Sequence, residues 1–158
     1  MGKRVGTKRS DRRWLDDTGQ EWASRYEYQV FCAFRDLGVN IRKCGKGDTI
    51  EYSEPKRNNK CLECGSERVV QTRTYTPDLC IDPDSEGGRT FIEVKGYMPA
   101  PKRKLFKDML KGRPDIDIAL VFEKDTRAPK SKLRYLEYTK RYFKIPAVAG
   151  IKNLEDLL

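Results

Sequence analysis

The sequence predicts a single α/β domain in which helices flank a mixed β-sheet. Residues 18–37 repeat apolar side chains at helical spacing, and residues 115–122 form an apolar run typical of a buried strand. Between them, residues 78–95 contain two strand-like runs separated by a loop. At 158 residues the chain has the length of one domain with its own core, and we place that domain at residues 14–158.

The composition narrows the function classes. The chain contains no histidine, which excludes Ser-His-Asp and Cys-His catalysis and histidine-ligated zinc hydrolysis. A net charge of +9 favours a polyanionic partner, for which nucleic acid is commoner than a membrane surface. Neither a signal peptide nor an apolar run of about 18 residues is present, so we expect a cytoplasmic protein with no membrane partner.

Residues 1–13 are basic and almost free of apolar side chains, which predicts a flexible arm. Its cations could neutralise several phosphates and become ordered on DNA. The predicted DNA-binding residues of this arm are Lys3, Arg4, Lys8, Arg9, Arg12 and Arg13.

The helix predicted over residues 18–37 ends before Gly38, and Glu27 falls within its apolar stripe. Two capping boxes compete for its first turn, one beginning at Ser24 and one at Thr18. If the helix begins at Ser24, Glu27 belongs to the cap. If it begins at Thr18, Glu27 is an inward carboxylate in mid-helix that needs a partner such as a metal ion or Lys95.

Residues 39–54 suggest two strands around a Gly45–Gly47 turn, followed by a polar insertion at about 55–68. The insertion carries Cys61 and Cys64 in a C-x-x-C-G pattern that is typical of half a zinc ribbon, and Cys44 could be a third zinc ligand. No fourth ligand is evident, because Cys32 and Cys80 fall in the predicted helix and strand.

The runs at 78–82 and 90–95 predict a hairpin whose turn centres near Ser85–Glu86, which sets Asp78 opposite the end of the second strand. Alternation places Glu93 and Lys95 on one face of that strand. Two carboxylates and a lysine at one end of a hairpin could hold a hard cation and a water beside a phosphate.

A helix is predicted at about 101–111, with Leu105, Met109 and Phe106 directed inward. Its first turn carries Lys102, Arg103 and Lys104, which oppose the helix dipole and therefore favour a phosphate backbone lying across them.

After the apolar strand, residues 131–144 predict a helix that offers Leu133, Tyr135, Tyr138 and Tyr142 for packing. The Lys and Arg residues of this helix are interpreted as a solvated face. A short segment and a terminal helical turn complete the chain.

The residues Pro77-Asp78 and Glu93-Val94-Lys95 resemble the motif of the PD-(D/E)xK nuclease superfamily. Over most of the chain, the order of elements resembles the bacteriophage endonuclease I family of Holliday junction resolvases. The segments that carry this resemblance are Ser24–Glu27, Tyr75–Asp78, Glu93–Gly96, Pro114–Ile118 and Val121–Phe122.

The resemblance implies an intertwined homodimer, phage-encoded, that resolves four-way DNA junctions by paired nicks. It further implies that Asp78, Glu93 and Glu27 bind one or two Mg²⁺ or Mn²⁺ ions per active site and that Lys95 is catalytic. The Cys61–Cys64 insertion departs from the family pattern. Two alternatives remain open: a sequence-specific or mismatch-nicking endonuclease, and a zinc-ribbon nucleic-acid-binding module without catalysis.

Overall fold

The computed structural model of the chain describes residues 14–55, 70–83 and 88–158. The arm predicted at residues 1–13 and the Cys61–Cys64 pair lie outside these residues. In chain order the elements are β1 (Trp14–Leu15), β2 (Glu21–Trp22), α1 (Arg25–Asp36), β3 (Ile41–Lys43), η1 (Lys46–Asp48), β4 (Ile50–Pro55), β5 (Val70–Tyr75), β6 (Leu79–Ile81), β7 (Thr90–Lys95), α2 (Ala100–Gly112), β8 (Ile118–Phe122), α3 (Tyr135–Tyr138), η2 (Thr139–Phe143), β9 (Ala147–Ala149) and η3 (Ile151–Leu157).

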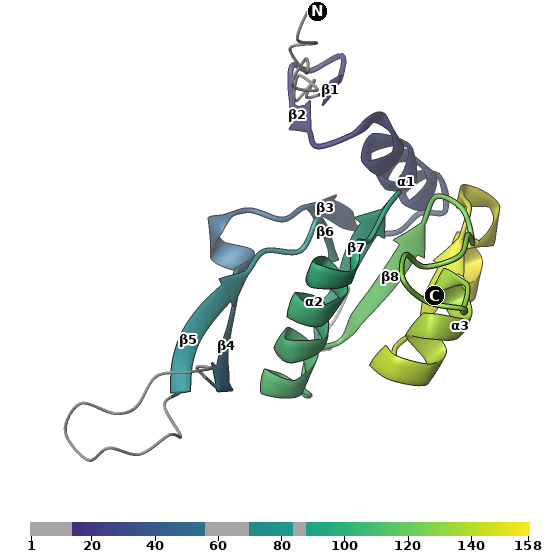
Figure 1. Ribbon diagram of the computed structural model, residues 1–158. Helices are drawn as coiled ribbons and strands as arrows, with labels where there is room; N and C mark the ends of the chain where they lie inside the picture. Colours follow the sequence, from purple (N-terminus) through teal and green to yellow (C-terminus); the bar gives the residue numbers. More distant parts are fainter. Residues whose placement is uncertain (1–13, 56–69, 84–87) are drawn as a thin grey trace, which may run out of the picture.

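The centre of the molecule is a five-stranded mixed sheet in the order β3-β6-β7-β8-β9 (Figure 1). Strands β3, β6 and β7 pair antiparallel, whereas β7, β8 and β9 pair parallel. Helix α2 forms the connection between the parallel neighbours β7 and β8, as such pairs require. The observed architecture confirms the predicted α/β class with a mixed sheet flanked by helices.

Each face of the sheet packs against its own core, because successive strand side chains point to opposite faces. Ile92 and Val94 of β7 belong to the core that Val30 and Phe34 of α1 complete. Phe91 belongs to the second core, which is built with α2, α3 and η2. The strand β8 is buried along its whole length because both faces are covered.

Strands β4 and β5 form a separate two-stranded antiparallel ribbon beside α2 (Figure 1). The two strands predicted at 39–54 are present as β3 and β4, but they join different sheets. Gly112 at the end of α2 lies so close to the ribbon that a Cβ atom there would stand 2.8 Å from the carbonyl oxygen of Ser53. The ribbon is therefore packed tightly on the helix that follows the predicted metal motif.

Helix α1 begins at Arg25, later than the predicted residue 18. The Ser24 hydroxyl accepts a hydrogen bond from the Glu27 amide at 3.1 Å, which decides between the two predicted capping boxes. The preceding residues form the short β1–β2 ribbon instead, with Trp22 buried against Phe31. The predicted stop is correct, since Gly38 has a φ of +78°.

Helix α2 agrees with its prediction except at Leu105. Phe106 and Met109 are fully buried, whereas Leu105 is exposed. The helix predicted at 131–144 begins only at Tyr135 and ends in the π-helical turn η2. Of the helices in the described ranges, none is both long and apolar enough to cross a membrane.

Candidate active site

The β6–β7 hairpin brings Asp78 and Lys95 together. Leu79 pairs with Ile92 in the antiparallel register, which places the preceding residue, Asp78, beside Glu93. The turn centred near Ser85–Glu86 predicted this register. One Asp78 carboxylate oxygen, Oδ2, accepts a hydrogen bond from the Val94 amide at 2.8 Å and lies 3.3 Å from Lys95 Nζ. The backbone of β7 thus fixes the orientation of this carboxylate.

Lys95 also forms an ion pair with Glu93, so its ammonium lies between the two carboxylates. Burial alone would lower the pKa of Lys95, but the charges of Glu93 and Asp78 outweigh it and raise that pKa. The lysine is therefore positively charged at neutral pH in the site as it stands.

Glu93 is the most deeply buried of these charged side chains, with 2% of its surface exposed. Burial, and after it the charge of Asp78, raises its pKa to about 7, against the opposing effect of Lys95. Within the described part of the chain, its oxygen Oε2 has no hydrogen-bond partner. A buried carboxylate oxygen without a partner is costly, which points to a ligand that the protein is built to receive.

Asp78, Glu93 and Lys95 line one pocket of about 410 Å³. The rest of its wall comes from the end of β5 and the start of α2, and its other lining residues are Tyr75, Thr76, Met98, Pro101, Lys102 and Leu105. Leu105 therefore lines the pocket and is not a core residue, since 39% of its surface is exposed. Tyr75 was not among the site residues predicted from the sequence. It lines the pocket with Glu93, and burial, followed by the charge of Glu93, raises the pKa of its phenol.

Glu27 is buried on α1 but does not line the pocket. Its helix covers the Ile92–Val94 face of the sheet, whereas Glu93 points to the other face. Burial, and after it the charge of Asp78, raises the pKa of Glu27 to about 7, while Lys43 and then Lys95 act in the opposite direction. Glu27 thus lies within electrostatic range of the Asp78 cluster. The sequence suggested that Glu27 is either part of the helix cap or buried in mid-helix. In the structure it belongs to the first turn of α1 and is nevertheless buried.

The three cations predicted at the start of α2 have different surroundings. Lys102 lines the pocket, and Lys104 is exposed and lies 3.2 Å from Asp108. Arg103 was predicted to bind DNA, but the structure does not place its side chain at the surface. Arg103 is buried on the core side of α2, where its guanidinium donates to the carbonyl oxygens of Met98 and Pro129.

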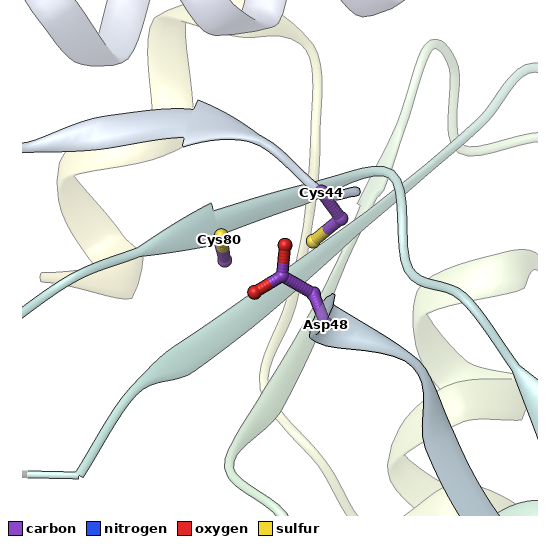
Figure 2. Close-up of side chains that lie close together, drawn as sticks. All are labelled: Cys44, Asp48 and Cys80. Carbon is purple, nitrogen blue, oxygen red and sulfur yellow. The ribbon is translucent and has the colours of Figure 1, made fainter. Parts of the chain in front are cut away.

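A second cluster joins Cys44, Asp48 and Cys80 beside the pocket hairpin (Figure 2). Their ligand atoms lie within 4.8 Å of one another, so the group could hold a metal ion. Sequence reasoning set Cys80 aside because it lies in a strand. The β3–β6 pairing brings it to Cys44, and that register was not predictable from local pattern. The predicted ligands Cys61 and Cys64 fall outside the described residues.

The surroundings of Asp48 disfavour a cation in this second cluster. Its two oxygens accept hydrogen bonds from Arg42 at 2.7 and 2.9 Å, from Arg89 at 2.7 Å and from the Gly45 amide at 2.8 Å. Arg42 thereby holds the pKa of Asp48 below its usual range, while burial raises the pKa of Cys44. A metal ion would have to displace a guanidinium and deprotonate buried thiols. The carboxylate set around Asp78 is the better site for a hard cation.

No known protein-family model matches this chain, and no curated protein matches it in sequence.

Proposed function

We propose that this protein is a metal-dependent, structure-selective endodeoxyribonuclease that acts on four-way DNA junctions. The observation that carries the proposal is the buried Glu93 carboxylate, which has an unpartnered oxygen in a pocket shared with Asp78 and Lys95. Buried acids with raised pKa values beside a lysine are typical of catalytic sites. The motif resemblance names phosphodiester hydrolysis as the chemistry.

The donor atoms suit Mg²⁺ or Mn²⁺, one or two ions per site. Asp78 and Glu93 offer carboxylate oxygens, which are the ligands that hard divalent ions prefer. A bound ion would satisfy Glu93 Oε2 and lower the raised pKa of Glu93. When present, the metal would supply Lewis-acid activation of water and of the scissile phosphate.

Lys95 serves in this proposal as a cation beside the reacting phosphate. Because Glu93 and Asp78 raise its pKa, its ammonium stays charged and suits neutralisation of developing phosphate charge better than removal of a proton from water. Its position on β7, braced by the hydrogen bond from Val94 to Asp78, keeps it beside both carboxylates.

Glu27 is the proposed third carboxylate, which acts through its negative charge near Asp78. Its burial and its electrostatic coupling to Asp78 support this role. From the family resemblance we also propose a branched substrate, a dimer that makes paired nicks, and a phage origin. The net charge of +9 supports a nucleic-acid substrate.

The decisive experiment uses a synthetic four-way junction beside a linear duplex of the same sequence, with Mg²⁺ or with EDTA. We expect the junction to be cut in Mg²⁺ but not in EDTA, into products that carry 5′-phosphates. The linear duplex should not be cut. Equal cutting of the linear duplex would instead indicate a sequence-specific or mismatch-nicking enzyme. Binding of both DNAs without cleavage in Mg²⁺ or Mn²⁺ would indicate a non-catalytic module.

A further inference from the structure

Helix α2 (Figure 1) and the turn η2 contact each other on one face of the central sheet, and both carry an excess of basic side chains. The acid of α2 is Asp108, which is already paired with Lys104, and η2 contains no acid. The cations outside the core on these elements and at the end of η2 are Lys102, Lys104, Lys107, Lys111, Lys140, Arg141 and Lys144. Such an excess of one sign over two adjacent elements favours a polyanion.

Two of these cations are held by one aromatic ring. Lys107 Nζ lies 5.5 Å and the Arg141 guanidinium carbon 5.7 Å from the centre of the Tyr142 ring, which is 41% exposed. These are cation–π distances, so the ring fixes two flexible side chains that come from different elements. In the described ranges, neither Lys107 nor Arg141 makes an ion pair with a carboxylate, and both charges remain available to a partner.

The Tyr142 ring is connected to the buried Arg103 through Tyr138. Tyr142 lies 4.7 Å from Tyr138, and the Arg103 guanidinium lies 4.8 Å over the Tyr138 ring. Arg103 in turn donates to the Met98 carbonyl oxygen at 2.8 Å. Tyr142, which contacts both cations, is therefore connected through Tyr138 to a side chain buried in the core. A rigid support lowers the entropy lost when a ligand binds.

The charged surface shares helix α2 with one wall of the pocket. Lys102 lines the pocket at the start of α2, and Lys111 lies about 13 Å further along the helix axis at 1.5 Å per residue. Lys104 and Lys107 lie between them along the same helix. Helical phase places Lys104, Lys107 and Lys111 on another side of α2 from Lys102, so a polyanion whose reacting phosphate sits in the pocket would cross the exposed side of α2 to reach them and Arg141.

We propose that Lys104, Lys107, Lys111 and Arg141, here called the α2–η2 strip, bind the phosphate backbone of the duplex arm whose scissile phosphate enters the Asp78–Glu93 pocket. This inference rests on the proposed nuclease function and adds the surface on which the substrate lies. It reverses the interpretation of the η2 cations as a solvated face. The strip contacts phosphates and not base edges, so it contributes affinity without sequence preference.

The test compares two double variants of the full chain that remove the same charge. Lys107→Ala with Arg141→Ala alters the strip, whereas Arg35→Ala with Lys152→Ala removes two exposed cations on α1 and η3, which pack on the opposite face of the sheet. Binding to a four-way junction is measured in EDTA over a range of salt concentrations, so that cleavage plays no part.

We expect the strip variant to bind about tenfold more weakly, with the slope of log Kd against log salt reduced by about 2. The control should retain both values. Equal weakening by the two variants would overturn the proposal, because it would show that only net charge matters. Unchanged binding by the strip variant, or binding of an acidic protein in preference to DNA, would overturn it as well.

Tyr142 supplies a second, independent readout as a positioning residue. Tyr142→Phe keeps the ring that holds both cations and should bind like the parent, whereas Tyr142→Ala should lose several-fold affinity although no charge is removed. If Tyr142→Phe and Tyr142→Ala bind the junction with equal affinity, the ring does not position the two cations, and a preorganised α2–η2 strip is refuted. Failure of the nuclease proposal would look different, since cleavage in Mg²⁺ would be absent while the salt-dependent binding differences persisted.

Discussion

Burial, and after it the charge of Asp78, raises the pKa of both Glu27 and Glu93 to about 7, although the two side chains belong to opposite faces of one sheet. Asp78 thus couples electrostatically to an acid on each side of its strand. Since Glu27 and Glu93 share this neighbour, their protons are expected to leave in coupled steps that belong to the group as a whole.

The first prediction concerns metal binding and pH. Mn²⁺ binds ionised carboxylates, so its affinity should rise steeply from pH 6 to pH 8 as Glu27 and Glu93 lose their protons. Calorimetric titration of the full chain with Mn²⁺ at several pH values measures this. Glu93→Gln should bind Mn²⁺ weakly and with a shallower pH dependence. A flat affinity over this range would contradict the assignment of Glu93 as a ligand and of Glu27 as a charge that supports the site.

The first prediction extends to the pH dependence of stability without metal, which Glu27 and Glu93 also determine. Their folded-state pKa values lie above the unfolded values, so the stability they contribute is complete below the unfolded pKa and is lost as pH rises through about 7. In EDTA, Tm should therefore fall between pH 6 and pH 8, and Mg²⁺ should restore it at pH 8. The carboxyl of Asp48 has a lowered pKa and stays ionised throughout this interval, so its contribution is constant.

The second prediction concerns the reacting groups. Asp78→Asn and Lys95→Ala should each slow junction cleavage at least about a hundredfold, because each removes a charge from the pocket. Asn keeps an oxygen that can accept the Val94 amide, so the hairpin should remain intact. Lys124→Ala, an exposed lysine outside the pocket, is the matched control and should cut normally. Cleavage at the parent rate by Lys95→Ala would refute the assigned site.

The third prediction tests the start of α1. Ser24→Ala removes the hydroxyl that accepts the Glu27 amide and should lower the free energy of unfolding by about 1 kcal/mol. Thr18 makes its hydrogen bond to Asp16 within the exposed β1–β2 turn, so Thr18→Ala should change stability by less than about 0.5 kcal/mol. Urea unfolding of both variants compares them. The reverse order would place the helix start at Thr18.

Contacts between neighbouring segments of the chain were predictable from the sequence. The β6–β7 register was predictable because a turn centred near residues 85 and 86 fixes which residues of two neighbouring strands face each other. The shared face of Glu93 and Lys95 followed from the two-residue period alone. The roles of these residues stay predictions.

Interactions between distant segments were not predictable. Cys80 meets Cys44 only because β3 pairs with β6, and β4 leaves the main sheet to pair with β5. Arg103 and Lys102 are neighbours in sequence with the same charge, yet one faces the core and the other the pocket. Helical phase separates them, and that phase is set by packing against elements far along the chain.

The fourth prediction uses this difference between neighbouring cations. Arg103→Ala leaves the carbonyl oxygens of Met98 and Pro129 without their donor and should cost about 1–3 kcal/mol of stability. Lys102→Ala should leave Tm unchanged and weaken junction binding. Thermal unfolding and DNA titration of both variants separate the two roles. A stable Arg103→Ala protein would show that the buried guanidinium does not support the core.

The fifth prediction concerns the contact between α2 and the β4–β5 ribbon. Gly112→Ala forces a Cβ to within 2.8 Å of the Ser53 carbonyl oxygen and should destabilise the fold by about 1–3 kcal/mol. Gly47→Ala is the matched control, because no atom lies within 4 Å of the added Cβ there. Urea unfolding should show a lower midpoint for Gly112→Ala only. Equal midpoints would mean that the ribbon can shift away from the helix.

The separation of Glu27 from the β6–β7 hairpin has a consequence for the order of folding. Glu93 and Lys95 lie on β7 and Asp78 directly precedes β6, so all three meet when one hairpin closes, a step that costs little chain entropy and is fast. Glu27 joins them only when α1 docks from far upstream in the chain, a non-local step of the kind that slows folding. We therefore expect two of the three acids and the lysine to meet early. The third acid then arrives with the final consolidation of the core, so an incompletely folded chain would hold the hairpin cluster without it.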